Sequence, residues 1–106
     1  MANKTCVLGA TGFVGRALTS ALSAAGEPVR AASRRGERSS DAIERVSCDL
    51  ERAETLGPVL EGCDVVYYLV HSLGRADFRE TDRRCAHNVV DVAAAAGCQR
   101  IIYLGG

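Results

Sequence analysis

The sequence predicts an α/β fold built on a doubly wound, parallel, five-stranded sheet in the order 3-2-1-4-5. Short apolar runs alternate with segments in which apolar residues recur every three or four positions, a pattern typical of parallel strands joined by crossover helices. The first run leads into Gly9, Gly12 and Gly15, and these glycines lead into the first helical segment. Because crossovers are right-handed, few strand orders remain. At 106 residues, the chain is predicted to be one domain over residues 1–106.

The first half of the chain is predicted to contain three strands and one long helix. The helix spans residues 13–25, and Gly26 is expected to end it. Its apolar face is predicted to consist of Val14, Leu18, Ala21, Leu22 and Ala25. The strands are residues 5–8, 29–33 and 43–48, and the polar stretch 34–41 is predicted to be a loop.

A short helix is predicted after the third strand. Thr55 is its expected N-cap, and Pro58 is tolerable only if it lies in the first turn. Gly62 is expected to end it, and its apolar face is predicted to consist of Leu56, Val59 and Leu60.

The last part of the chain is predicted to be strand, loop, helix and strand. Residues 64–70 form a continuous apolar run, as a central parallel strand would. A loop over 71–74 leads to a long helix over 77–96 and a final strand over 100–104. The apolar face of this helix is predicted to consist of Ala86, Val89, Val90, Ala93 and Ala94.

Composition excludes several classes of function. Basic and acidic residues number 13 each, so the balanced charge favours neither a nucleic-acid nor an anionic-membrane partner. No apolar stretch is long enough to span a membrane, and the N-terminus has no secretory h-region. The five cysteines are widely spaced without a C-x-x-C motif, so we expect no metal site, no disulfide framework and a cytoplasmic location.

The glycine turn is the leading candidate for a ligand site. Gly9 allows a sharp turn, Gly12 removes a side chain where backbone must approach a pyrophosphate, and Gly15 lets the helix pack close to the strands. A helix N-terminus also carries unpaired N–H groups and the positive end of the helix dipole, and both attract phosphate. The strand–turn–helix context predicts a dinucleotide cofactor; the alternative is a tight turn without a ligand.

The end of the second strand predicts which dinucleotide is bound. An acidic residue there would hold the ribose hydroxyls of NAD, whereas arginine can pair with the 2′-phosphate of NADP. Ser33 ends the strand and is followed by Arg34 and Arg35, with no acid. We therefore predict NADP(H), with Arg34 as the better candidate and NAD(H) as the alternative. The two arginines can also be ordinary solvated loop residues.

Two further strand ends complete the predicted pocket. Asp49 can accept from the adenine amino group with Leu50 against the ring, although Asp49 can equally cap the next turn, and both roles are compatible. Across from the glycine turn, the nicotinamide side is predicted to be lined by Leu69, Val70, His71 and Ser72. His71 is a proton donor by type and Ser72 a hydrogen bonder, but a pocket wall or capping residue is the plainer interpretation.

Four other polar residues are expected to have mainly structural roles. Tyr67, Tyr68 and Tyr103 fall inside strands and are expected to pack in the core or at its rim. Asn88 in the long helix is expected either to hydrogen-bond neighbouring backbone near the cofactor or to be exposed.

Three stretches carry a family resemblance: Gly-Ala-Thr-Gly-Phe-Val-Gly at 9–15, Val-Tyr-Tyr-Leu-Val-His-Ser at 66–72 and Arg-Ile-Ile-Tyr-Leu-Gly-Gly at 100–106. Together they resemble the extended and atypical short-chain dehydrogenase/reductases, including NAD(P)H-binding proteins of the NmrA-like type. The resemblance implies an NAD(P)(H)-binding Rossmann domain. It implies pyrophosphate contacts from Gly9, Thr11, Gly12, Phe13 and Val14. It also implies 2′-phosphate contact from Arg34, adenine contact from Asp49–Leu50, and ribose and nicotinamide contacts from Leu69–Ser72.

The sequence departs from this family where catalysis is concerned. Active members use a Tyr-x-x-x-Lys pair after the fifth strand, whereas here the only lysine is Lys4. Gly105 and Gly106 stand where many relatives carry a catalytic serine. We therefore assign no catalytic residue and expect the amino-terminal, cofactor-binding half of a reductase, truncated after strand 5, lacking the substrate-binding part and inactive alone. The alternative is a non-catalytic NmrA-like nucleotide-sensing or interaction module. An uncovered fifth strand also predicts self-association through its edge.

Overall fold

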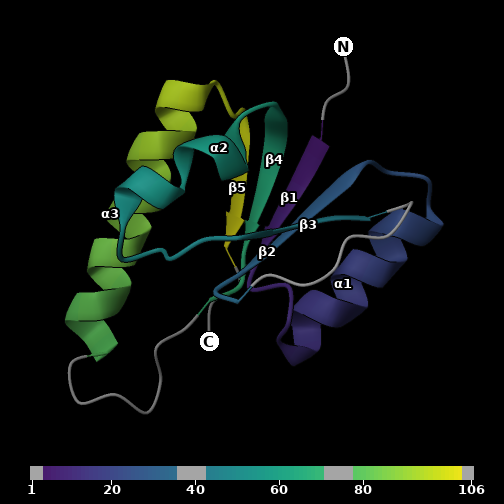
Figure 1. The fold of residues 1–106 in the computed structure, drawn as a ribbon, viewed down its shortest axis with the longest axis horizontal. Coiled ribbons are helices and arrows are strands. Elements are labelled where there is room, and N and C mark those ends of the chain that lie inside the picture. The colour runs from purple at the N-terminus through teal and green to yellow at the C-terminus, as the bar shows by residue number, and fades with distance from the viewer. Residues whose placement is uncertain (1–3, 36–42, 71–77, 104–106) are drawn as a thin grey trace.

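A computed structural model describes residues 4–35, 43–70 and 78–103 and confirms the predicted sheet (Figure 1). Five parallel strands pair in the order β3-β2-β1-β4-β5, so the doubly wound α/β fold is as expected. The strands are β1 (Lys4–Leu8), β2 (Val29–Ser33), β3 (Ile43–Ser47), β4 (Cys63–Tyr68) and β5 (Arg100–Tyr103). The helices are α1 (Phe13–Ala24), the 3₁₀ turn η1 (Ala53–Thr55), α2 (Gly57–Leu60) and α3 (Phe78–Ala96).

The two faces of the sheet are covered by different helices. Figure 1 shows α1 on one side and α2 with α3 on the other. Because side chains alternate along a strand, each face has its own core. The smaller core lies under α1 and contains Val7, Ala10, Val29 and Ala31. The larger core, under α2 and α3, includes Leu8, Leu56, Leu60, Val66, Tyr68, Cys85, Val89 and Ala93.

Helix α1 ends as predicted, but the residues that pack against the sheet differ in part from the predicted ones. Gly26 has φ +83°, and the Gly26 and Glu27 N–H groups donate to Ser23 and Leu22 oxygens at 3.0 Å each, which closes the helix C-terminus. The predicted apolar face is wrong in part, because Val14, Ala21 and Ala25 are exposed. The buried residues are Gly15 and Thr19, with Leu18 and Leu22 half-buried beside them. Because the buried Gly15 has no side chain, the helix packs close to the sheet at this residue.

The predicted N-cap role of Thr55 is wrong. Thr55 ends η1, and Leu56 is the N-cap of α2. The Thr55 hydroxyl instead accepts from the Asp49 N–H at 3.0 Å and lies 2.9 Å from the Asp49 oxygen to which it can donate. Pro58 does lie in the first turn of α2, as expected, and Gly62 follows the helix with φ +79°.

The predicted apolar face of helix α3 is correct at Val89 and Ala93 and wrong at Val90 and Ala94. Thr81, Cys85, Val89 and Ala93 are buried, whereas Val90 is 54% exposed and Ala94 is exposed too. The alanine run gave no indication of which side met the sheet, because alanine suits either environment. Strand β4 ends two residues before the predicted Val70, and β3 ends at Ser47. The predicted loop at 71–74 and most of the loop at 34–41 lie outside the described residues.

A charged cluster holds α2 to the opposite end of the sheet from the glycine turn. Arg30 Nη1 donates to the Val59 and Glu61 oxygens at 2.7 Å each, which satisfies carbonyls at the helix C-terminus. Arg30 Nε and Lys4 Nζ pair with Glu44 Oε1 at 3.0 and 2.6 Å. These two cations, Lys4 more strongly, lower the pKa of Glu44 below its ordinary value.

Two further findings concern the described ranges. Within residues 4–35, 43–70 and 78–103, no helix has the length and apolar character needed to cross a bilayer. All five cysteines are free thiols, and no metal-binding group of His, Cys, Asp and Glu occurs in that part of the chain.

Candidate functional site

The glycine turn lies where the strand order reverses, between β1 and β4. The N–H groups of Gly9 and Ala10 both donate to the Ala32 oxygen, at 3.0 and 3.1 Å, so the end of β2 fixes one side of the turn. On the other side, the Leu69 N–H donates to the Leu8 oxygen at 3.1 Å. The turn is therefore held by backbone from both neighbouring strands. Ligands of open α/β sheets bind at this kind of position.

The three glycines have different structural requirements. Gly9 has φ +89°, and a Cβ there would lie 3.0 Å from Val70 Cγ2 and 3.2 Å from the Leu69 carbonyl carbon. At the buried Gly15, a Cβ would lie 2.1 Å from the Gly9 oxygen. At Gly12 the nearest atom would be 3.6 Å away, an ordinary contact. The fold therefore needs glycine at positions 9 and 15 but leaves space beside Gly12.

The N-terminus of α1 is available to an anion. Gly12 is the N-cap, no side chain caps the helix, and the first turn contains no acidic residue. The first N–H groups of a helix have no partner within it, so they favour a negative ligand. Arg16 Nε donates to the Thr11 oxygen at 3.0 Å, which adds positive charge beside the exposed Thr11. Phe13 is 93% exposed and Val14 is 45% exposed at the same helix end.

The predicted adenosine side lies at the ends of β2 and β3. Ser33 is half-buried, and its oxygen accepts from the Cys48 N–H at 2.9 Å, which joins the two strand ends. Arg34 and Arg35 follow and are exposed. Among the described residues, neither guanidinium makes a hydrogen bond or ion pair. Both arginines therefore follow the strand whose Ala32 oxygen holds the glycine turn, and both are exposed.

Asp49 and Leu50 form a fixed loop at the end of β3. Asp49 Oδ1 accepts from the Glu51 N–H at 3.0 Å, which confirms the capping role predicted as an alternative for this carboxylate. Leu50 is only 7% exposed and belongs to the larger core, so its contact with adenine stays a prediction. Asn88 Nδ2 donates to the Leu50 oxygen at 2.8 Å, which confirms the expected hydrogen bond from α3 to backbone.

Leu69 and Val70 form the wall across from the glycine turn. Both are half-buried and directly follow β4, at positions that a Cβ added at Gly9 would meet. The adjoining His71 and Ser72 lie outside the described residues, so their predicted place on the nicotinamide side stays a prediction.

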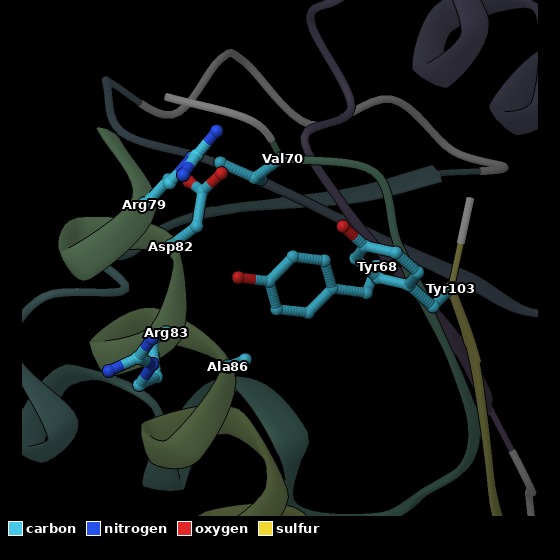
Figure 2. A pocket seen from close by; sticks show the side chains of 7 residues that line it. All are labelled: Tyr68, Val70, Arg79, Asp82, Arg83, Ala86 and Tyr103. Atoms are coloured by element: carbon cyan, nitrogen blue, oxygen red, sulfur yellow. The ribbon is translucent and has the colours of Figure 1, made fainter. Parts of the chain in front are cut away.

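A small pocket adjoins Val70 at the carboxyl ends of β4 and β5 (Figure 2). Its volume is about 290 Å³, and it is lined by Tyr68, Val70, Arg79, Asp82, Arg83, Ala86 and Tyr103. The Tyr68 and Tyr103 rings pack at 5.5 Å between centroids, as expected for packed strand tyrosines. Sequence reasoning missed the charged residues, although their spacing along the long helix places them on one face.

Comparison with protein families identifies the class. A family model described as NAD(P)H-binding matches residues 9–106, which is nearly the whole chain. The match begins at the first glycine of the turn and includes every residue of the candidate site. The chain belongs to this NAD(P)H-binding family.

Solved structures with the same fold include several oxidoreductases. Uronate dehydrogenase from Agrobacterium tumefaciens has a TM-score of 0.86 and 24% identity over 100% of this chain and 42% of its own. A short-chain dehydrogenase/reductase superfamily protein from the same organism, with bound NAD, has a TM-score of 0.77 and 27% identity over 95% and 32%. Vestitone reductase from alfalfa has a TM-score of 0.78 and 20% identity over 94% and 35%.

The chain spans well under half the length of these three proteins. It corresponds to their fold over β1 to β5, so the activities of the whole proteins do not transfer to it directly. A comparison with curated proteins gives no match.

Proposed function

We propose that this chain is the dinucleotide-binding part of a short-chain dehydrogenase/reductase-like oxidoreductase, that it prefers NADP(H) to NAD(H), and that it transfers no hydride alone. The observation that carries the proposal is the uncapped N-terminus of α1, opening from a glycine turn that leaves space at Gly12. The dinucleotide would supply a hydride donor or acceptor. The chain itself would bind and orient it.

Each part of the cofactor has a candidate partner in the chain. The N–H groups after Gly12 would hold the pyrophosphate, with the exposed Phe13 and Val14 beside it. Arg34 would pair with the 2′-phosphate, with Ser33 and Arg35 next to it. Asp49 Oδ2 would accept from the adenine amino group, because Oδ1 already holds the loop. Leu69 to Ser72 would line the nicotinamide side.

Calorimetric titration of NADPH and NADH into the protein tests the preference. We expect saturable binding of both, tighter for NADPH. Arg34→Gln should weaken NADPH binding about tenfold or more, the effect of one hydrogen-bonded charge pair, and leave NADH nearly unchanged. Arg100→Gln is the matched control, because Arg100 is an exposed arginine at the start of β5, the other end of the sheet. Tighter binding of NADH than NADPH would contradict the preference.

A non-catalytic nucleotide-sensing or interaction module is the second candidate. The observation that favours it is the position of Lys4, the only lysine, at the start of β1 in an ion pair of 2.6 Å with Glu44. That position is at the far end of the sheet from the glycine turn, so Lys4 cannot act on a bound nicotinamide. NADPH consumption with carbonyl compounds tests both candidates. We expect binding without turnover, and sustained turnover by this chain would contradict it.

We also propose self-association through β5 and a location in the reducing cytoplasm. Strand β5 is at the sheet edge, with Ile101 37% and Tyr103 58% exposed. Unpaired backbone on an exposed edge strand favours pairing with a second copy. Sedimentation should show concentration-dependent dimers, and a monomer at every concentration would overturn this. The five free thiols support a reducing compartment.

A further inference from the structure

The pocket beside Val70 is lined by a hydrogen-bond donor, the hydroxyl of Tyr68. Tyr68 is only 4% exposed, and its hydroxyl makes no hydrogen bond to any part of the chain that the structure describes. Figure 2 shows its ring extending from β4 toward α3, with the hydroxyl on the pocket side. Burial raises the pKa of Tyr68 above its ordinary value, so the hydroxyl keeps its proton at neutral pH. A hydroxyl that keeps its proton can donate a hydrogen bond to a ligand acceptor in the pocket.

The charges around this donor favour an anion. Arg79 and Arg83 contribute two guanidinium groups to the pocket lining and Asp82 one carboxylate, so the net charge of the lining is positive. Arg83 is exposed and, within the described ranges, makes no ion pair or hydrogen bond. Its planar group presents paired N–H donors that match a carboxylate.

The size and position of the pocket limit the ligand. A volume of about 290 Å³ is at the lower end of the range for small-molecule sites. Asp82 would repel an anion while the two arginines attract it, so the shape of the anion decides, and a planar carboxylate matches the planar, paired N–H donors of Arg83. Val70 is part of the pocket lining, and its Cγ2 would lie 3.0 Å from a Cβ added at Gly9, so the pocket lies next to the glycine turn but is separate from it.

We propose that this pocket binds a small organic carboxylate, which accepts a hydrogen bond from the Tyr68 hydroxyl and pairs with Arg83. The inference does not depend on the dinucleotide. If a cofactor does occupy the glycine turn, the carboxylate lies beside its nicotinamide end, at the place of a substrate.

Titration of acetate into the protein, followed by amide chemical shifts at constant ionic strength, tests the proposal. Acetate should shift signals of residues 79–86 saturably. Acetamide has nearly the same shape without the charge and should not. Inorganic phosphate at the same concentrations should bind more weakly. No saturable shift with acetate, an equal response to acetamide, or tighter binding of phosphate would each overturn the proposal.

Two pairs of variants locate the binding site. Tyr68→Phe keeps the ring, removes the unpartnered hydroxyl and should weaken acetate binding about tenfold. Tyr67→Phe is its control, because Tyr67 packs against the core on the α1 face. Arg83→Gln should likewise weaken binding. Its control is Arg84→Gln, because Arg84 pairs with Glu51 at 3.0 Å outside the pocket lining. Equal effects within either pair would overturn the assignment, and a parallel NADPH titration separates its failure from that of cofactor binding.

Discussion

Replacing Gly15 with alanine should strongly destabilise the domain. The added Cβ would lie 2.1 Å from the Gly9 oxygen and 2.9 Å from Ala10 Cα, both backbone atoms that no side-chain rotation can move. Overpacking of this kind costs about 3 kcal/mol at the upper end of the usual range. Alanine in a helix returns about 1 kcal/mol relative to glycine. The net loss is about 2 kcal/mol, which lowers Tm by about 10 °C for a domain of this size.

Thermal unfolding followed by circular dichroism measures this loss. Gly57→Ala is the control, because an added Cβ there meets nothing within 4 Å. Gly12→Ala separates folding from binding. Its Cβ would lie 3.6 Å from the nearest atom, so Tm should stay near that of the wild type. NADPH binding by Gly12→Ala should weaken at least about tenfold, because the methyl group stands where the pyrophosphate approaches. If Gly15→Ala were as stable as Gly57→Ala, the close-packing argument would be refuted.

Three other changes have defined outcomes. Asn88→Ala removes the hydrogen bond to the Leu50 oxygen and should lower the free energy of unfolding by about 1 kcal/mol in a urea titration, whereas no change would mean that the bond does not hold the loop. Because the folded-state pKa of Glu44 is lowered below 4.5, its contribution to stability is present above that pH and is lost as the pH falls through the folded pKa. Urea unfolding at neutral pH and at about pH 3 should therefore show that acid lowers the free energy of unfolding less for Glu44→Gln than for the wild type. Equal decreases would contradict the argument. Without ligand, Tyr68→Phe should have an equal or higher Tm, since its hydroxyl has no hydrogen bond to the described residues, and a marked decrease would show that the hydroxyl has a partner.

The strand order and the glycine turn could be predicted because local pattern determines both. An apolar run, a glycine at the turn and a three-residue spacing to Gly15 leave few alternatives, and the right-handed crossover settles the order. The face of α3 and the role of Thr55 could not be predicted in the same way. Val90 and Val89 are chemically alike, and only contact with the sheet decides that Val89 is buried and Val90 is not. Thr55 suits a cap, but its hydroxyl instead contacts the backbone of Asp49 and the Arg52 oxygen.

The position of the glycine turn at the carboxyl edge of the sheet could be predicted from the sequence, because the carboxyl ends of parallel strands meet at one edge. The last residues of β3 and β4 were not predicted correctly, and neither was the pocket. The pocket depends on the distance between α3 and β5, and nothing local to Arg83 or Tyr103 encodes that distance. The sequence predicts a backbone hydrogen bond of Asn88 as one of two alternatives, but only the folded chain identifies the acceptor as the Leu50 oxygen.

The backbone bonds that hold the glycine turn from both sides also bear on how cofactor choice could change. The Ala32 oxygen fixes the turn before the chain reaches Arg34 and Arg35, and both arginines are exposed just beyond that point. The turn that would hold the pyrophosphate is therefore fixed by backbone atoms, and neither arginine side chain contributes to that bond pair. Substitution at these two exposed positions can alter nucleotide preference with little effect on folding, so the domain is a suitable scaffold for selecting variants with switched cofactor use.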